Sequence, residues 1–274
     1  MHKRHTVTLR IIVAVSVCLA LFFSAFAGEG WAQGTTGKKW TFVVFGDTRD
    51  DTKATDRGIS AVLPQLARFI ANERPDLVVF NGDMVNGYWT NKKSFLHGNY
   101  KAMFLNWLKA TTPIREAAIP LYIVRGNHEF GGEVRSGGVP DLIRTFNEIF
   151  ASTMPQNGPD DAKGLTYSFP YRSAFFVVTD QYVGSTGTDV TINLPWITRQ
   201  LKENTRPFVF VFGHSPAFHV TQSSDESEFQ LFNVPAVRDQ FWRLMVQNRV
   251  VAYIASHEHF YTRGKRDSVY QIVQ

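Results

Sequence analysis

The sequence has almost no cysteine. Cys18 is the only cysteine in 274 residues, and it lies within an uncharged, mostly apolar run, residues 11–27. If that run is removed on export, the remaining chain forms no internal disulfide and offers no thiolate ligand, even in an oxidising compartment. Any metal bound by the rest of the chain is therefore held by nitrogen and oxygen atoms.

The N-terminal segment has the pattern of an export signal. Its first ten residues are basic, an apolar run follows, and Ala25-Phe26-Ala27 forms a small-x-small cleavage pattern. We therefore predict that residues 1–27 are a signal peptide, cut after Ala27 or, as a second choice, after Ala32, and that the mature protein is periplasmic or secreted. An uncleaved membrane anchor is the alternative, although the run only just approaches the length of a membrane span. Residues 28–39 are small and polar, which favours a linker.

The chain also lacks a strong net charge once this segment is set aside. The formal charge of +5 includes Lys3, Arg4 and Arg10, so the chain from residue 28 onward carries +2. A charge this small indicates no nucleic-acid surface. Contact with a membrane is expected only if the N-terminal segment stays in place, and no pattern in the sequence indicates an oligomeric state.

Five apolar runs with the length of a buried strand are each followed by side chains that bind metals or protons. The runs are residues 42–45, 77–80, 121–124, 208–212 and 250–255. The side chains that follow them are Asp47, Asp83, Asn127, His128, His214, His257 and His259. Ligand sites of open α/β sheets gather at the carboxyl edge of the strands, so we expect these side chains to meet there. A hydrophobic core does not need its strands to end in this way, whereas a metal site with more than one ion does.

Apolar residues recur at helical spacing between these runs. We expect helices over residues 56–72, around Met103 to Leu108, and over 141–150, 194–203 and 235–248. A hairpin over residues 167–179 and a strand over 269–273 complete the prediction. Alternating strands and helices indicate one layered α/β domain over residues 40–274. Because the chain stops within a strand, we expect its natural C-terminus to lie further on.

Aspartate, asparagine and histidine at strand ends favour a hard to borderline divalent ion such as Mn²⁺, Fe²⁺ or Zn²⁺. Asp83 has two carboxylate oxygens with which to bridge two ions, and His257 and His259 alternate along an extended chain, so they can serve different ions. Two ions about 4 Å apart activate a water and hold the attacking and leaving oxygens of an in-line displacement. His128 is then placed to protonate the leaving oxygen.

The ordered blocks Gly46-Asp47, Gly82-Asp83, Gly126-Asn127-His128-Glu129, Gly213-His214 and His257-Glu258-His259 resemble the calcineurin-like metallophosphoesterase superfamily over residues 40–274. The resemblance implies an α/β fold, a four-layer α-β-β-α sandwich of two mixed sheets, and a dinuclear centre that hydrolyses small phosphate mono- or diesters. It also implies ligands for a first metal (Asp47, Asp83 and His259) and for a second metal (Asp83, Asn127, His214 and His257). His128 matches the catalytic histidine of the family.

Two positions depart from the family pattern. Arg49 stands where the block Asp-x-His has its histidine, and an arginine has no lone pair to offer a metal. Arg49 either binds a phosphate oxygen of the substrate or pairs with Asp50 or Asp51 at the surface. His97 is a further histidine that could fill the vacated place. Ser256 replaces a glycine before the His-x-His pair, which is a mild change.

We therefore predict an exported, metal-dependent phosphoesterase in which a metal-activated water attacks phosphorus. The alternative is a protein that binds or senses a phosphate ligand on the same scaffold with a weakened first metal site, and Arg49 is the feature in its favour. His128 stands against it, because a binding protein needs no catalytic histidine. Tyr88 and Trp89 are further candidates for lining the substrate pocket.

Overall fold

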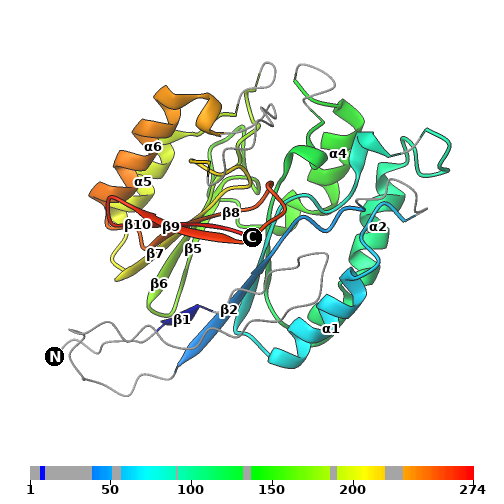
Figure 1. Cartoon of the computed structure of the whole chain (residues 1–274), viewed down its shortest axis with the longest axis horizontal. Coiled ribbons are helices and arrows are strands. Elements are labelled where there is room, and N and C mark those ends of the chain that lie inside the picture. Colours follow the sequence, from blue (N-terminus) through cyan, green and yellow to red (C-terminus); the bar gives the residue numbers. More distant parts are fainter. Residues whose placement is uncertain are drawn as a thin grey trace.

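Two β-sheets pack against each other in the centre of the molecule, and helices cover the outer side of each (Figure 1). The structure is a computed structural model of the chain. It describes residues 7–9, 39–50, 57–90, 92–131, 137–185, 190–219 and 231–274. The arrangement is the four-layer α-β-β-α sandwich that the family resemblance implied.

The first sheet consists of parallel strands in the spatial order β1 (Val7–Leu9), β2 (Trp40–Phe45), β3 (Leu77–Asn81) and β4 (Leu121–Val124). All residues of β3 are buried, as expected for a parallel strand covered on both faces. The helices of this half are α1 (Leu63–Glu73), α2 (Tyr100–Ala110), α3 (Thr112–Glu116) and α4 (Pro140–Ile149). Figure 1 shows α1, α2 and α4 on the outer side of the first sheet.

The second sheet has the spatial order β5 (Tyr167–Tyr171), β6 (Ala174–Val178), β7 (Phe208–Phe212), β8 (Ala252–Ala255), β10 (Val269–Val273) and β9 (Thr262–Arg266). The β5–β6 and β9–β10 pairs are antiparallel and the others are parallel. Helices α5 (Leu194–Glu203) and α6 (Pro235–Gln247) cover its outer side (Figure 1). Of the two sheets predicted to be mixed, only the second is mixed among the described strands, because each described neighbour pair of the first sheet runs parallel.

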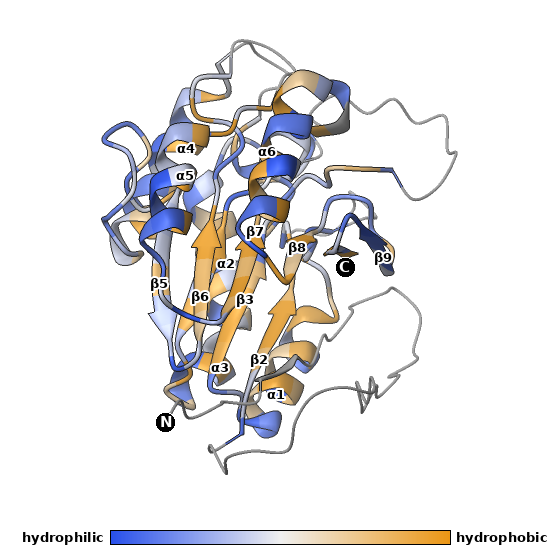
Figure 2. Cartoon of the chain, turned by 90° about the vertical axis from the view of Figure 1, so that its left-hand side faces the viewer, coloured by the Kyte–Doolittle hydropathy of each residue, from blue (hydrophilic) through white to orange (hydrophobic). Residues whose placement is uncertain are grey.

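Aromatic side chains fill the space between the sheets. Phe42 of β2 meets Phe176 of β6 and Phe210 of β7 edge-on, with ring centroids 5.2 and 5.1 Å apart. Tyr122 of β4 stacks on Phe169 of β5 at 3.7 Å. Figure 2 shows the hydrophobic strands of both sheets and the mixed, amphipathic colouring of α5 and α6. The burial of these rings holds the two sheets in one relative position, and that position decides which strand ends can meet.

Most predicted elements are confirmed, and two predictions differ from the structure. The helix expected over residues 56–72 begins only at Leu63, because Pro64 favours the first turn of a helix and the residues before it form turns. Strand β9 was not expected. Its sequence Thr-Arg-Gly-Lys-Arg is polar and exposed, and it forms a strand because it pairs with the apolar β10 at the sheet edge.

The predicted signal peptide and linker lie almost wholly outside the described residues, so both stay predictions. The exception is Val7–Leu9, which pairs with β2 in parallel. Cleavage after Ala27 would remove this strand and leave β2 at the edge of the first sheet. Within the described part of the chain, every helix is too short or too polar to cross a membrane.

Candidate metal centre

The carboxyl ends of five strands meet at one edge of the two sheets. In the first sheet Phe45 pairs with Phe80 and Phe80 with Ile123, so β2, β3 and β4 end at the same level. In the second sheet Phe212 of β7 pairs with Ile254 of β8. The loops that follow these strands therefore start side by side, and the predicted donor residues lie in those loops.

Hydrogen bonds tie these loops to one another. The N–H of Asp47 donates to the carbonyl of Gly82 over 2.9 Å, and the N–H of Arg49 donates to the carbonyl of Asp83 over 3.1 Å. The N–H of His257 donates to the Asp47 carboxylate over 3.0 Å. This last bond connects the second sheet to the first at the centre itself.

Four of the predicted ligands turn sharply out of their strands. Asp47, Asp83, His257 and His259 have positive φ angles of 50°, 58°, 78° and 56°. This left-handed conformation is uncommon outside glycine, and Asp and His are among the side chains that tolerate it best. Such strained residues persist where the surrounding structure demands them, and they cluster at functional sites. Their gathering at one sheet edge therefore marks this edge as the candidate site.

Four donor atoms lie at the spacing of a tetrahedral metal site. His214 Nε2 is 3.3 Å from Asp83 Oδ1 and 3.1 Å from Asn127 Oδ1. His257 Nδ1 is 3.1 Å from Asn127 Oδ1 and 3.3 Å from His214 Nε2. Ligand atoms that are about 2.0–2.1 Å from an ion at tetrahedral angles are about 3.3 Å apart. This second donor group, Asp83, Asn127, His214 and His257, therefore fits a divalent ion.

The first donor group consists of Asp47, Asp83 and His259. One ligand atom from each lies within 4.8 Å of the others, and Asp83 belongs to both groups, as expected for a bridging carboxylate. The guanidinium of Arg49 reaches into this group, with Nη2 3.2 Å from His259 Nε2 and Nε 3.8 Å from Asp83 Oδ2. The first donor group thus has fewer protein donors and contains a cation, so it fits a metal less well than the second.

His128 lies beside the donors without belonging to either group. Its Nδ1–H donates to the carbonyl of Asn86 over 3.1 Å, and its Nε2 is 3.8 Å from Asp83 Oδ2. The ring of Trp89 packs against it with centroids 4.5 Å apart. Burial lowers the pKa of His128 to about 4, so the ring is neutral in the metal-free protein at neutral pH. The contacts leave Nε2 as the atom of His128 that can exchange a proton.

The charges of the centre are strongly coupled. Burial raises the pKa of Asp47 to about 8. Burial works in the same direction on Asp83, but His214, His128 and Arg49 together outweigh it and hold the pKa of Asp83 well below its usual range. Burial alone would lower the pKa of His214, yet the Asp83 carboxylate raises it to about 9. The Nδ1–H of His214 donates to the carbonyl of Asn81 over 2.9 Å, which leaves Nε2 to bind a metal once its proton is displaced.

Glu129, which sequence reasoning left without a role, anchors the centre. Its carboxylate is fully buried and accepts hydrogen bonds from the N–H groups of Asp83, Met84 and Gly126 over 2.9, 2.8 and 3.0 Å. The φ of Gly126 is −98°, so its backbone conformation is open to any residue. Glycine is needed there for space, because a Cβ would lie 2.2 Å from Asp83 Oδ1. The only sequence signal for Glu129 is its place directly after the histidine of the same block.

The other candidates take different positions. His97 Nδ1 donates to the carbonyl of Thr90 over 3.0 Å, and His97 belongs to neither donor group, so it does not fill the place of the missing histidine. His219 Nδ1 lies 3.2 Å from Glu258 Oε1. Arg49 points into the centre. Of the two aspartates with which it was alternatively expected to pair at the surface, Asp50 is buried, and Asp51 lies outside the described residues. Of the two aromatic candidates, Trp89 contacts the predicted catalytic ring.

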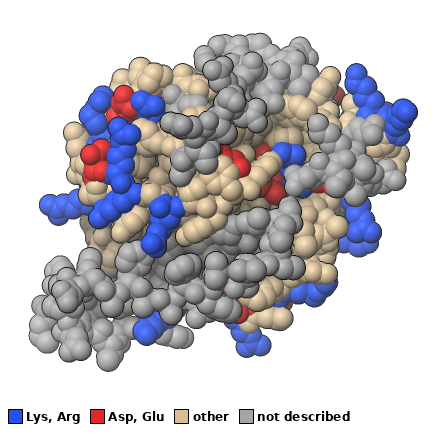
Figure 3. Space-filling view, viewed as in Figure 1, with Lys and Arg blue, Asp and Glu red and all other residues tan. Residues whose placement is uncertain are grey.

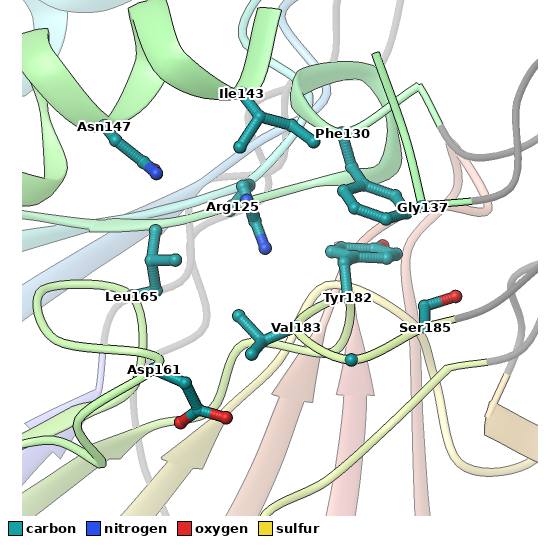
Figure 4. A pocket seen from close by; sticks show the side chains of 11 residues that line it. Arg125, Phe130, Gly137, Ile143, Asn147, Asp161, Leu165, Tyr182, Val183 and Ser185 are labelled. Atoms are coloured by element: carbon teal, nitrogen blue, oxygen red, sulfur yellow. The ribbon is translucent and has the colours of Figure 1, made fainter. Parts of the chain in front are cut away.

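Figure 3 shows one face of the molecule, on which a small group of acidic and basic atoms lies near the middle and most other lysine and arginine side chains of the described residues lie toward the rim. A separate cavity of about 290 Å³ lies between α4 and the loops after β4 and β6 (Figure 4). Its walls include Arg125, Phe130, Ile143 and Tyr182 and none of the metal donors.

The sandwich and the donors at its carboxyl edge agree with the family resemblance of the sequence. The family model of the calcineurin-like phosphoesterases matches residues 41–261. The chain belongs to the calcineurin-like phosphoesterase family. No curated protein matches the chain.

Solved structures share the fold at low sequence identity. A dimetal phosphatase from Danio rerio has a TM-score of 0.58 and 18% identity, over 85% of this chain and 86% of that one. The purple acid phosphatase PPD1 from yellow lupin has a TM-score of 0.60 and 16% identity, over 85% of this chain and 43% of that one. PhoD has a TM-score of 0.62 and 13% identity, over 85% and 55%. At these identities the likeness shows the fold alone.

Proposed function

We propose that the chain is an exported phosphoesterase that hydrolyses small phosphate mono- or diesters with a metal-activated water. Membership of the calcineurin-like phosphoesterases supports phosphoester hydrolysis. The clustered nitrogen and oxygen donors support dependence on a divalent metal, with Mn²⁺, Fe²⁺ or Zn²⁺ as the ions that suit them. The signal-peptide pattern of residues 1–27 supports a periplasmic or secreted location.

The observation that carries the proposal is the position of His128 next to a complete set of metal donors. Asp83 Oδ1 lies 3.3 Å from His214 Nε2 within the second donor group. The other oxygen of the same carboxylate, Oδ2, lies 3.8 Å from His128 Nε2. A group able to transfer a proton thus stands at the border of the metal site. A protein that only stored a metal would have no use for this arrangement.

Each residue of the centre has a proposed role. Asp83, Asn127, His214 and His257 hold a divalent ion, which when bound acts as a Lewis acid and lowers the pKa of a water. Asp47 and His259, with Asp83, form the place where the family resemblance implies a second ion. The guanidinium of Arg49 faces the same space and is suited to a phosphate oxygen.

The catalytic role falls to His128. The hydrogen bond from its Nδ1–H to the carbonyl of Asn86 fixes the ring, so that Nε2 faces the reacting groups. A phosphate ester bound beside it adds negative charge, which favours the protonated ring, and Nε2–H then donates its proton to the leaving oxygen.

The test is hydrolysis of p-nitrophenyl phosphate and bis(p-nitrophenyl) phosphate by the metal-loaded protein, with wild type and His128→Ala compared. We expect kcat to fall about 10²- to 10⁴-fold in the variant, the range for loss of a general acid, while the bound metal per chain stays the same. His97→Ala, at an exposed histidine outside the centre, is the matched control and should keep wild-type kcat.

The rival function is a phosphate-binding or sensor protein on the same scaffold, and the presence of Arg49 among the donors favours it. It predicts that neither ester is hydrolysed with any added metal, whereas inorganic phosphate still binds in calorimetry. That result would exclude the enzyme. N-terminal sequencing of the protein from its native host tests the location, since a chain that begins at Gly28 is the expected product of cleavage.

A further inference from the structure

The guanidinium of Arg49 engages the atoms that a first metal ion would need. Its Nη2 is 3.2 Å from His259 Nε2 and its Nε is 3.8 Å from Asp83 Oδ2. An arginine N–H only donates hydrogen bonds, so His259 Nε2 accepts this one with the lone pair that a metal would otherwise take. The Arg49 side chain is only 18% exposed, so most of it lies inside the centre.

The backbone holds Arg49 in this place. The N–H groups of Thr48 and Arg49 both donate to the carbonyl of Asp83, over 2.8 and 3.1 Å. The indole N–H of the buried Trp107 donates to Thr48 Oγ1 over 3.0 Å, and the N–H of Asp50 donates to Asn86 Oδ1 over 2.7 Å. Residue 49 is thus fixed on both sides relative to Asp83, and its side chain starts at the rim of the first donor group.

A metal ion and the Arg49 guanidinium fit poorly together in the first donor group. An ion about 2.1 Å from His259 Nε2 would lie at most about 5.3 Å from Arg49 Nη2, the sum of the two distances. Like charges this close repel strongly where water is scarce. One divalent ion in the second donor group and the Arg49 guanidinium together bring three positive charges to a centre whose donors include the carboxyl groups of only Asp47 and Asp83. A second divalent ion beside the guanidinium would add two more positive charges without a further carboxyl ligand.

We propose that the guanidinium of Arg49 takes the place of the first ion. The chain then holds one divalent ion, bound by the second donor group, whereas the family pattern implies two ions. Asp47 and His259 then serve to position Arg49 instead of a metal. The role of Arg49 toward the phosphate of a substrate rests on the proposed function, but the number of ions per chain does not.

The test counts metal in the absence of substrate. Wild type and Arg49→His, which restores the Asp-x-His block, are equilibrated with Mn²⁺. The metal per chain is measured by mass spectrometry of the digested protein, and the spin state by electron paramagnetic resonance. We expect one Mn²⁺ per chain with the spectrum of an isolated ion in wild type. In Arg49→His we expect two, with the spectrum of an exchange-coupled pair.

Two further variants separate Arg49 from nonspecific effects. Asp47→Asn should leave one ion per chain in the wild-type background and should reduce two to one in the Arg49→His background. Arg115→His introduces a histidine at an exposed arginine of α3 and should keep one ion. If Arg49→His does not fold, as judged by circular dichroism, Arg49→Gln serves instead. It removes the charge and should bind two Mn²⁺ per chain, whereas wild type binds one.

Either of two results overturns the inference: a coupled pair of ions in wild type, or one ion both in wild type and in folded variants without the arginine. Hydrolysis is a separate readout. One ion per chain without ester hydrolysis would reject the proposed function and support the replacement of the first ion by Arg49. Two ions per chain with ester hydrolysis would support the proposed function and reject that replacement.

Discussion

The salt bridge between Arg125 and Asp180 joins the two sheets at the edge that carries the metal centre. Arg125 follows β4 and Asp180 follows β6, and Nε and Nη2 of the arginine donate to Oδ2 and Oδ1 of the aspartate over 2.8 and 2.9 Å. The two side chains are 2% and 0% exposed. Asp180 Oδ1 also accepts the N–H groups of Tyr182 and Val183, both over 2.8 Å. Figure 4 shows Arg125 beside the rings of Phe130 and Tyr182.

Replacing Asp180 by alanine would leave a buried guanidinium with no carboxylate and two backbone N–H groups with no acceptor. Removal of one partner of a buried ion pair costs about 3–5 kcal/mol. Each N–H left without an acceptor adds about 1–3 kcal/mol where water cannot enter. We therefore expect the free energy of unfolding to fall by at least about 3 kcal/mol. For a domain of this size, a loss of 3–5 kcal/mol lowers the melting temperature by roughly 6–20 °C.

Urea and thermal unfolding of the metal-free protein measure this loss. The double variant Arg125→Met/Asp180→Leu removes both charges and should recover most of the stability, because a buried ion pair is replaceable by apolar side chains of similar volume. The control is Glu148→Ala. Glu148 Oε1 lies 3.1 Å from Arg144 Nη1, and the side chains of Arg144 and Glu148 are 61% and 60% exposed. Loss of this exposed ion pair should lower the free energy of unfolding by less than about 1 kcal/mol. A cost below about 1 kcal/mol for Asp180→Ala, or a double variant no more stable than the single one, would refute the reasoning.

Two further predictions concern the loops that hold Asp83. Glu129→Gln turns one of the accepting oxygens into an N–H donor that faces backbone N–H groups. We therefore expect the Mn²⁺ affinity measured by calorimetry to drop about 10- to 100-fold. An unchanged affinity would contradict the anchoring role of Glu129. Gly126→Ala places a Cβ 2.2 Å from Asp83 Oδ1 and should displace that carboxylate and abolish tight Mn²⁺ binding. Gly264→Ala, where no neighbouring atom lies within 4 Å of the added Cβ, should bind Mn²⁺ as wild type does.

The strands that carry the centre were predictable because each is a continuous apolar run. Strand β3 is buried throughout and β7 nearly so, and a run of that kind has few alternatives to a covered strand. Helix α5 has the bounds that its helical spacing predicted. Strand β9 carries no such signal. It is polar and exposed, and it exists through its pairing with β10, which only the folded chain reveals.

The convergence of the donors was also predictable, since parallel strands end at a common edge. The direction of individual side chains was not. Arg49 and His259 are 210 residues apart in the sequence, and their contact depends on how the first sheet faces the second. The salt bridge of Arg125 with Asp180 depends on the same packing. Glu129 receives its role only when the loop after β3 folds over it.

The backbone contacts that hold the two donor groups predict that a substitution at position 49 changes the metal content without changing the fold. The backbone of Arg49 is held through its own N–H on the carbonyl of Asp83, a bond that a histidine or glutamine at position 49 leaves in place. The second donor group is held by other contacts, from His214 to the carbonyl of Asn81 and from the Asp83 N–H to Glu129. A histidine or an arginine at position 49 therefore meets the same surroundings. Histidine at position 49 offers a lone pair, and arginine a fixed positive charge. This difference decides whether the first donor group binds an ion of its own.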